Sequence, residues 1–112
     1  AVRDFVHVDD LADAHLRALG YLSQGGSSDA FNLGAGTGVS VLDVLREVEI
    51  AVGKPVATAP EPRRPGDAPQ LISNWARAES QLGWRPNRSG LDNIVSSAWH
   101  WHRSTTIDQD KE

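Results

Sequence analysis

The sequence contains no cysteine and no methionine, and it holds only one tyrosine and two phenylalanines. Without cysteine the chain can form neither a disulfide nor a thiolate metal site, which agrees with a reducing cytoplasm, where we expect the protein. The sequence also lacks an apolar run of membrane-spanning length and a basic segment followed by an apolar one. We therefore expect neither a membrane span nor a secretion signal in these 112 residues.

An excess of positive charge is absent as well. The formal net charge is -4, whereas binding to nucleic acid or to an anionic membrane needs a basic face. The hydrophobic fraction of 39% and the charged fraction of 23% are typical of a soluble globular chain of one domain. The first residue is alanine rather than methionine, and strand-like sequence follows at once, which is unusual for a complete protein.

Apolar periodicity predicts a single α/β unit of mixed architecture. Alternating side chains predict strands over residues 2–8 and 30–33, an edge strand over 55–59 and a short extension over 70–73. Apolar residues at helical spacing predict helices that end near residues 21, 52, 82 and 102. We expect residues 1–103 to form the domain and residues 104–112 to be a polar, frayed tail.

Capping residues predict where the helices begin and end. The expected N-caps are Asp9 or Asp10, Ser40 in a capping box with Asp43, Asn74, and Ser89 with Asp92. Glycines are expected to end the second and third helices, at Gly53 and Gly83. We expect apolar faces on the first helix from Leu11, Leu16, Leu19 and Leu22, and on the second from Val41, Leu42, Leu45 and Val48.

One loop has the composition of an anion site. Residues 62–67 read Pro-Arg-Arg-Pro-Gly-Asp, with two guanidinium groups and a carboxylate on a turn stiffened by proline. Arginine presents a charged fork that matches phosphate oxygens two at a time, and the carboxylate of Asp67 can accept from sugar hydroxyls. Such a loop suits a phosphorylated sugar or a nucleotide. The alternative is a solvated turn with an internal ion pair.

Arg3 lies on a strand that is expected to be half-buried, and a guanidinium there needs a partner. The neighbouring Asp4 points to the other face of the strand. An anionic ligand shared with Arg64 would supply the partner. The alternative is a surface arginine on an edge strand.

Other candidate sites are weaker. The turn with Gly34, Gly36 and Gly38 follows a predicted strand, but Val39 stands where a dinucleotide fingerprint needs its third glycine, so we expect a tight turn and no bound cofactor. The four histidines fall on different elements or different sides of one helix, and we expect no metal site. The pair Asp9 and Asp10 is better explained by helix capping than by catalysis, and the tryptophans by core packing than by stacking on a base.

Four segments, in order, resemble the extended short-chain dehydrogenase/reductases that act on nucleotide sugars, and the UDP-glucose 4-epimerase branch in particular. Residues 2–12 (VRDFVHVDDLA) are similar to the family's R-D-Y/F-I/V-H-V-x-D-L-A segment. Residues 31–44 (FNLGAGTGVSVLDV) are similar to its N-L-G-x-G-x-G-x-S-V segment, residues 63–67 to R-R-x-G-D, and residues 82–86 to L-G-W-x-P. The resemblance extends to about residue 102.

The resemblance implies a fold, a ligand and residue roles. Members of the family hold a UDP-sugar between a Rossmann domain that binds NAD and a smaller C-terminal domain, and this chain resembles the C-terminal domain alone. By the resemblance, Arg3 and Arg64 would hold the diphosphate of UDP, and Asp67 a ribose hydroxyl. The family forms homodimers, largely through helices of the other domain.

Catalytic residues cannot be carried over by the resemblance. The family's base is the tyrosine of Y-x-x-x-K, whereas the only tyrosine here, Tyr21, is followed four residues later by Gly25. The NAD fingerprint G-x-x-G-x-x-G is also absent. We therefore expect this chain to be the UDP-sugar-binding portion of such an enzyme, to be inactive alone and to bind no NAD. Another nucleotide-sugar epimerase or dehydratase, or a nucleotide-binding remnant without catalysis, are the alternatives.

Overall fold

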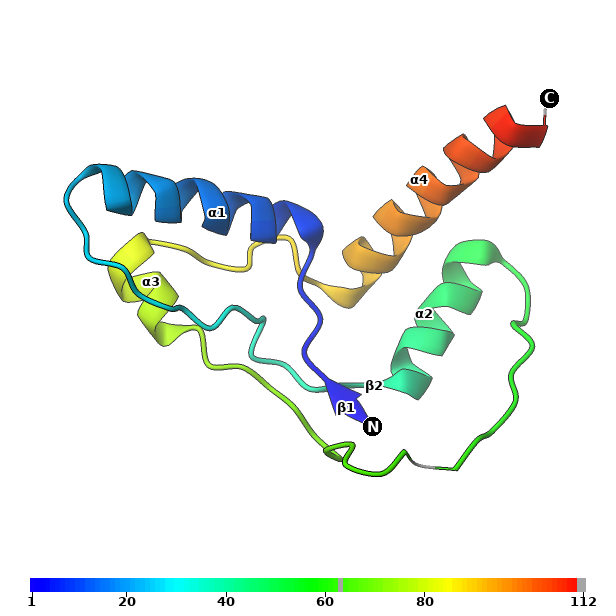
Figure 1. The fold of residues 1–112 in the computed structure, drawn as a ribbon. Coiled ribbons are helices and arrows are strands. Elements are labelled where there is room, and N and C mark those ends of the chain that lie inside the picture. Colours follow the sequence, from blue (N-terminus) through cyan, green and yellow to red (C-terminus); the bar gives the residue numbers. More distant parts are fainter. Residues whose placement is uncertain (63, 111–112) are drawn as a thin grey trace.

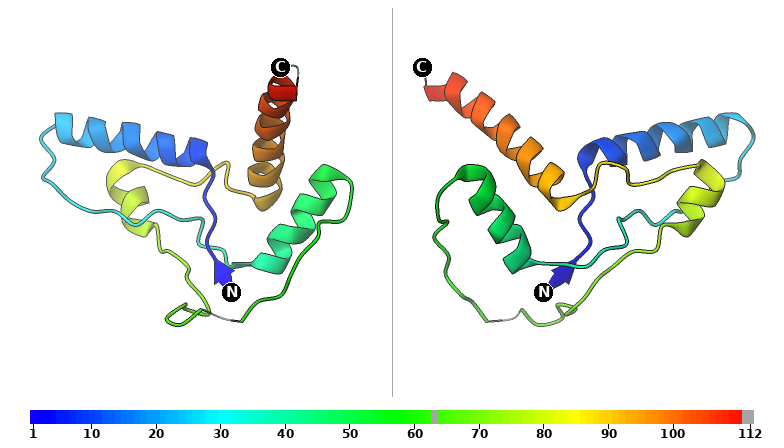
Figure 2. Two further views of the ribbon diagram at one scale, coloured as in Figure 1. Left: turned by 45° about the vertical axis from the view of Figure 1, so that its right-hand side comes forward. Right: turned by 180° about the vertical axis from the view of Figure 1, so that it is seen from behind.

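The computed structural model describes residues 1–62 and 64–110 and shows two pairs of helices joined by a small sheet (Figure 1). The elements are β1 (Val2–Arg3), α1 (Val8–Ser23), β2 (Val39–Ser40), α2 (Val41–Val52), α3 (Ala76–Leu82) and α4 (Leu91–Asp110). Helix α1 packs with α3, and α2 packs with α4. The views in Figure 2 show the two pairs diverging from the sheet, so that α4 and α1 point away from each other. The predicted α/β class is confirmed at this level.

The sheet is smaller than the sequence predicts. Strand β1 pairs antiparallel with β2, with Val2 opposite Ser40, and Val2 also bridges in parallel to Gln70. The strands predicted over 30–33 and 55–59 are not formed. Residues 30–33 keep the alternation of a strand, with Phe31 and Leu33 half-buried. However, no hydrogen bond within the described residues reaches the backbone of 31–33, and a strand needs a neighbour to form a ladder.

Helix α1 begins two or three residues earlier than predicted, because a histidine caps it. His7 is the N-cap, and its Nδ1 accepts from the backbone N–H of Asp9 at 2.9 Å. The prediction that Asp9 or Asp10 is the cap is therefore wrong. Both carboxylates lie in the first turn, where their negative charges interact favourably with the positive end of the helix dipole.

The two most deeply buried residues of α1 are a small one and a polar one. Ala14 is 2% exposed and Asp10 is 4% exposed. Leu16 and Leu19, which we expected on the buried face, are 70% and 63% exposed. Small residues let α1 approach α3 closely, where Ala78 is fully buried, and this leaves the leucines on the outside.

The core between α1 and α3 is built around one tryptophan. Trp84 is fully buried and joins Ala14 and Ala78 in a single cluster. Its indole Nε1–H donates to the carbonyl of Asp10 at 2.8 Å. Trp75 meets Trp84 edge to face, with the ring centroids 6.2 Å apart. The expectation that tryptophans fill the core is confirmed for Trp84.

Helix α2 begins and ends as predicted. Ser40 and Asp43 form the capping box, and Gly53 ends the helix with a φ of 83°. The backbone N–H and hydroxyl of Ser40 hold the pKa of Asp43 below its ordinary value. Because the pKa of Asp43 is lower in the folded chain than its ordinary value, the hydrogen bonds of Ser40 to this carboxylate contribute fully to stability above the ordinary pKa. This contribution is lost as the pH falls through the folded pKa. Leu42, expected on the buried side, is 63% exposed.

Helices α3 and α4 also differ from the prediction at their ends. Gly83 ends α3 as expected, but Trp75 is the N-cap residue, and Asn74 lies one position earlier with its Oδ1 accepting from Ala76. Helix α4 begins at Leu91 and continues to Asp110, beyond the predicted end near residue 102. The hydroxyl of Ser104 donates back to the carbonyl of His100 within this extension.

The chain is more open than a compact domain of its size. Its radius of gyration is 17.3 Å, whereas about 13 Å is expected for a compact chain of this length. The accessible surface is 8270 Å², against about 6,000 Å² expected for a folded protein of this mass. The excess of more than a third means that large surfaces are uncovered in the chain by itself. Among the described residues, no helix is both long enough and apolar enough to cross a membrane.

Candidate functional site

The predicted anion loop is ordered by its own side chains. Arg64 Nε donates to Asp67 Oδ2 at 3.1 Å, and the backbone N–H of Asp67 donates to the carbonyl of Arg64 at 3.2 Å. Gly66 adopts a φ of 82°, which a residue with a side chain would adopt only with strain. The Arg64 side chain is 84% exposed, and that of Asp67 is 34% exposed. Arg63, the other arginine of the motif, lies outside the described residues.

A hollow of about 340 Å³ lies beside this loop. It is lined by Ala1, Glu61, Pro62, Arg64, Asp67 and Ala68. Arg64 and Asp67 therefore border one open space, in which a guanidinium can meet an anion and a carboxylate can meet a hydroxyl group. Glu61 also borders the space, and its negative charge repels an anion that binds near it.

Arg3 is tied to the end of the same loop. Its Nη1 donates to the carbonyl of Val2 at 2.8 Å and to the carbonyl of Ala68 at 3.0 Å. Backbone carbonyls thus supply the partner that we expected from an anionic ligand. Arg3 is not among the residues that line the hollow. The structure therefore places Arg64 and Asp67 in direct contact, and it ties Arg3 to the carbonyl of Ala68, the residue that follows Asp67.

Asp4 has a role that the sequence did not reveal. Its carboxylate accepts from three backbone N–H groups, those of Ala35 at 2.8 Å, Gly36 at 3.0 Å and Ser73 at 3.0 Å. This carboxylate clamp joins the start of the chain to the glycine turn and to the segment before α3. The only available signal was that Asp4 alternates away from Arg3 along an extended segment.

The clamp also explains the first glycine of the turn. A Cβ built on Gly34 would collide with Asp4 Oδ2 and with the Cβ of Ser73. We expect Gly34→Ala to lower the free energy of unfolding by about 1–3 kcal/mol, because the clamp has to open to make room. Denaturant unfolding measures this loss. Gly53→Ala is not a suitable control, because its φ of 83° brings a different strain, whereas Gly20→Ala has open space around its Cβ and should not destabilise.

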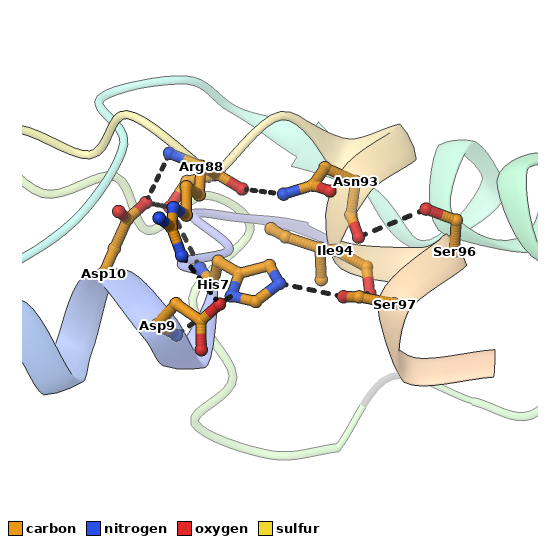
Figure 3. A network of polar contacts seen from close by, with 9 residues as sticks. His7, Asp9, Asp10, Arg88, Asn93, Ile94, Ser96 and Ser97 are labelled. Atoms are coloured by element: carbon orange, nitrogen blue, oxygen red, sulfur yellow. Dashed lines mark hydrogen bonds and ion pairs between the residues drawn. The ribbon is translucent and has the colours of Figure 1, made fainter. Parts of the chain in front are cut away.

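A buried polar network joins the start of α1 to the start of α4, as Figure 3 shows. His7 Nε2 lies 2.8 Å from Ser97 Oγ on α4, and the backbone N–H of His7 donates to Ser89 Oγ at 2.9 Å. His7 Nδ1 accepts from Asp9, so the hydrogen bonds assign the proton to Nε2. Ser97 Oγ in turn donates to the carbonyl of Ile94 at 3.1 Å.

Asp10 is the acidic centre of this network. Its Oδ2 accepts from the hydroxyl of Ser89 and from the backbone N–H of Arg88 at 2.9 Å. Ser89 was predicted to start the last helix, but its hydroxyl is used between His7 and Asp10 instead. Asp9, by contrast, is half-exposed and pairs with the side chain of Arg88 at 3.1 Å. Neither carboxylate caps the helix, and every bond that Asp10 makes here is internal to the fold.

The glycine turn does not fit a dinucleotide. A phosphate-binding turn needs backbone N–H groups that point at the ligand. Here the N–H groups of Ala35 and Gly36 point at the carboxylate of Asp4. A negative group already fills the position that a pyrophosphate would take. The residues of this turn are therefore unsuited to holding NAD.

Comparison with known proteins shows which proteins this chain is similar to. Residues 1–34 match the NAD dependent epimerase/dehydratase family. Over 103 residues, 92% of this chain, the sequence is 45% identical to the UDP-glucose 4-epimerase of Lacticaseibacillus casei and 47% identical to that of Streptococcus mutans. The expected resemblance to UDP-glucose 4-epimerases is thus confirmed. The chain spans about 31% of the length of each of these two relatives.

Solved structures agree with the sequence relatives. The UDP-glucose 4-epimerase of Stenotrophomonas maltophila, with bound NAD and formylated UDP-arabinopyranose, superposes with a TM-score of 0.88 at 35% identity over 96% of this chain and 32% of that one. The enzyme of Bifidobacterium longum, in complex with NAD+ and UDP, superposes with a TM-score of 0.81 at 34% identity over 93% of this chain and 30% of that one.

Proposed function

We propose that this chain is the C-terminal, UDP-binding part of an NAD-dependent UDP-glucose 4-epimerase. Residues 1–103 would form the nucleotide-sugar domain, with residues 104–112 as its polar tail. The observation that carries the proposal is the Arg64–Asp67 pair beside an open hollow, in a chain 45–48% identical over 92% of its length to three UDP-glucose 4-epimerases.

In this proposal Arg64 holds the diphosphate of UDP and Asp67 accepts from a ribose hydroxyl. An exposed pair such as Arg64–Asp67 contributes at most about 1 kcal/mol. A diphosphate can therefore displace the carboxylate from the guanidinium at little cost and accept two charge-assisted hydrogen bonds in its place. Arg3 would fix the loop through Ala68 and add positive charge behind the diphosphate.

The chemistry would need the rest of an epimerase. When bound, NAD supplies the hydride acceptor and donor for inverting the sugar, and the glycine turn here is unsuited to it. Tyr21 has no lysine four residues on, so this chain also lacks the family's catalytic pair. The proposed role of the chain alone is to bind and orient the UDP-sugar, in the partnership with a Rossmann domain that the relatives' greater length suggests.

Calorimetric titration with UDP tests the proposal. We expect saturable binding by the purified chain, and a loss of at least about tenfold in affinity for Arg64→Ala, since charge-assisted bonds contribute about 1.5–3 kcal/mol. Arg46→Ala is a matched control, because Arg46 is also exposed and also pairs with an aspartate three residues away. A folded chain that binds no UDP at millimolar concentration would show that it has no diphosphate site of its own.

A further inference from the structure

The start of the chain holds the segment that follows the anion loop. The backbone N–H of Val2 donates to the carbonyl of Pro69 at 3.0 Å, and the carbonyl of Val2 accepts from the N–H of Leu71 at 3.0 Å. Two residues further along both segments, the N–H of Ser73 donates to the carboxylate of Asp4 at 3.0 Å. In a regular parallel ladder a backbone carbonyl would accept this bond. The Asp4 side chain thus extends the pairing of β1 by one more hydrogen bond.

The same carboxylate also holds the glycine turn. Its oxygens accept from the N–H groups of Ala35 at 2.8 Å and Gly36 at 3.0 Å. The turn leads into β2 and α2, and the N–H of Val41, the first residue of α2, donates to the carbonyl of Ala1 at 3.2 Å. Asp4 therefore fixes the segment after the anion loop relative to α2, the helix from which the chain enters that loop.

The two ends of the anion loop are not held equally. Residues 54–62, which lead into it from α2, are exposed. A hydrogen bond that ties them to α2 is long, from the N–H of Val56 to the Glu49 carboxylate at 3.4 Å. By contrast, Asp67 is half-buried, at the end that the carboxylate clamp holds. Because Arg64 bonds to Asp67 across a tight turn, the position of this end also sets the position of the guanidinium.

We propose that Asp4 is a positioning residue for UDP, because its clamp sets the place and orientation of the loop that carries Arg64 and Asp67. The inference rests on the proposed function of that loop. Asp4 is not among the described residues that border the hollow, so it acts through the backbone and not by touching the ligand. A loop that is held before binding loses less conformational freedom when the ligand arrives, which strengthens binding.

Two variants open the clamp in different ways. Asp4→Ala removes the acceptor of all three hydrogen bonds. Gly34→Ala keeps every side chain of the clamp and of the loop, but its Cβ collides with the carboxylate of Asp4 and with Ser73. We expect each variant to lower the affinity for UDP at least about fivefold in calorimetric titration, because the loop has to be ordered on binding.

Each variant has a matched control. Asp29 also accepts from a backbone N–H, that of Ala30, and from a residue far along the chain, Arg77, and neither donor belongs to the loop or its flanks. Asp29→Ala is therefore the control for the loss of a bridging carboxylate. Gly20→Ala is the control for the added methyl group, because its Cβ meets open space. Both controls should bind UDP as the unmodified chain does.

A second measurement needs no UDP and separates positioning from a general loss of structure. Residual dipolar couplings of the N–H bonds of Gly66 and Asp67 report the orientation of the loop. In both clamp variants we expect these couplings to fall by about half or more, because the loop then samples several orientations. The couplings within α2, which keeps its own capping box, should not change. A merely structural role of Asp4 would leave the loop couplings unchanged or would alter those of α2 equally.

The two measurements have distinct outcomes. Unchanged loop couplings in the clamp variants would overturn the inference, as would fallen couplings with unchanged UDP affinity. If the unmodified chain binds no UDP, the proposed function is rejected, and the couplings alone decide whether Asp4 sets the loop. If Asp4→Ala does not fold, Gly34→Ala supplies both measurements, since it leaves the side chains of Asp4, Arg64 and Asp67 in place.

Discussion

Replacing Trp84 with alanine is expected to lower the free energy of unfolding by about 3–5 kcal/mol, which is enough to unfold a marginally stable chain. Trp84 is the only large side chain among the described residues that is fully buried. Its removal leaves a cavity between Ala14 and Ala78 and also leaves the carbonyl of Asp10 without its donor. Among the described residues the buried apolar side chains form this cluster alone, so no second one can replace it.

Urea unfolding followed by tryptophan fluorescence and by circular dichroism measures the loss. Trp101→Ala is the matched control, because Trp101 is 71% exposed and should change stability by less than about 0.5 kcal/mol. Trp84→Phe keeps an aromatic ring but no indole N–H, so it should fall between the two. Equal stabilities of the Trp84→Ala and Trp101→Ala variants would show that the core is elsewhere.

Replacing Asp10 with alanine is expected to cost about 3 kcal/mol or more of unfolding free energy. The carboxylate is almost completely buried and accepts from both Ser89 and Arg88. Alanine would leave the buried hydroxyl of Ser89 and the partly buried N–H of Arg88 without their acceptor. Hydrogen bonds to charged groups contribute about 1.5–3 kcal/mol each. The start of α1 would also lose its connection to the segment before α4.

Two further variants define the origin of this effect. Asp10→Asn keeps one oxygen that can accept both bonds, so it should be clearly more stable than Asp10→Ala. Asp9→Ala removes a half-exposed carboxylate that pairs with Arg88, and should cost less than about 1 kcal/mol. The prediction fails if Asp9→Ala and Asp10→Ala destabilise equally in thermal and urea unfolding.

The sequence predicted features that depend on residues close together in the chain. The capping box of Ser40 and Asp43 and the end of α2 at Gly53 are as expected, because neighbouring residues determine them. The contact between Arg64 and Asp67 is of the same kind, since the turn that brings them together lies between them. These parts needed no knowledge of the rest of the fold.

Features that depend on distant partners were not predicted. Asp4, Ser89 and Asp10 were assigned to alternation or capping, yet each bonds to a segment far along the chain. The prediction that Leu16 and Leu19 are buried was wrong, because helical spacing identifies an apolar face but not the segment that covers it. The strand predicted over residues 30–33 is not formed for the same reason, because a strand needs a neighbouring strand to pair with.

The hydrogen bonds of residues 4–10 also set the order in which the chain can fold during synthesis. Each of three residues here can form its hydrogen bond only after a distant partner has been synthesised. Asp4 bonds to Ser73, which lies 69 residues later. Asp10 bonds to Arg88, which lies 78 residues later, and His7 bonds to Ser97, which lies 90 residues later. Contacts of such high sequence separation form late, because a long loop has to close before they are made. We expect ribosome-bound chains that end before Ser89 to leave the start of α1 open to proteases. Protection should appear only after α4 has emerged from the ribosome.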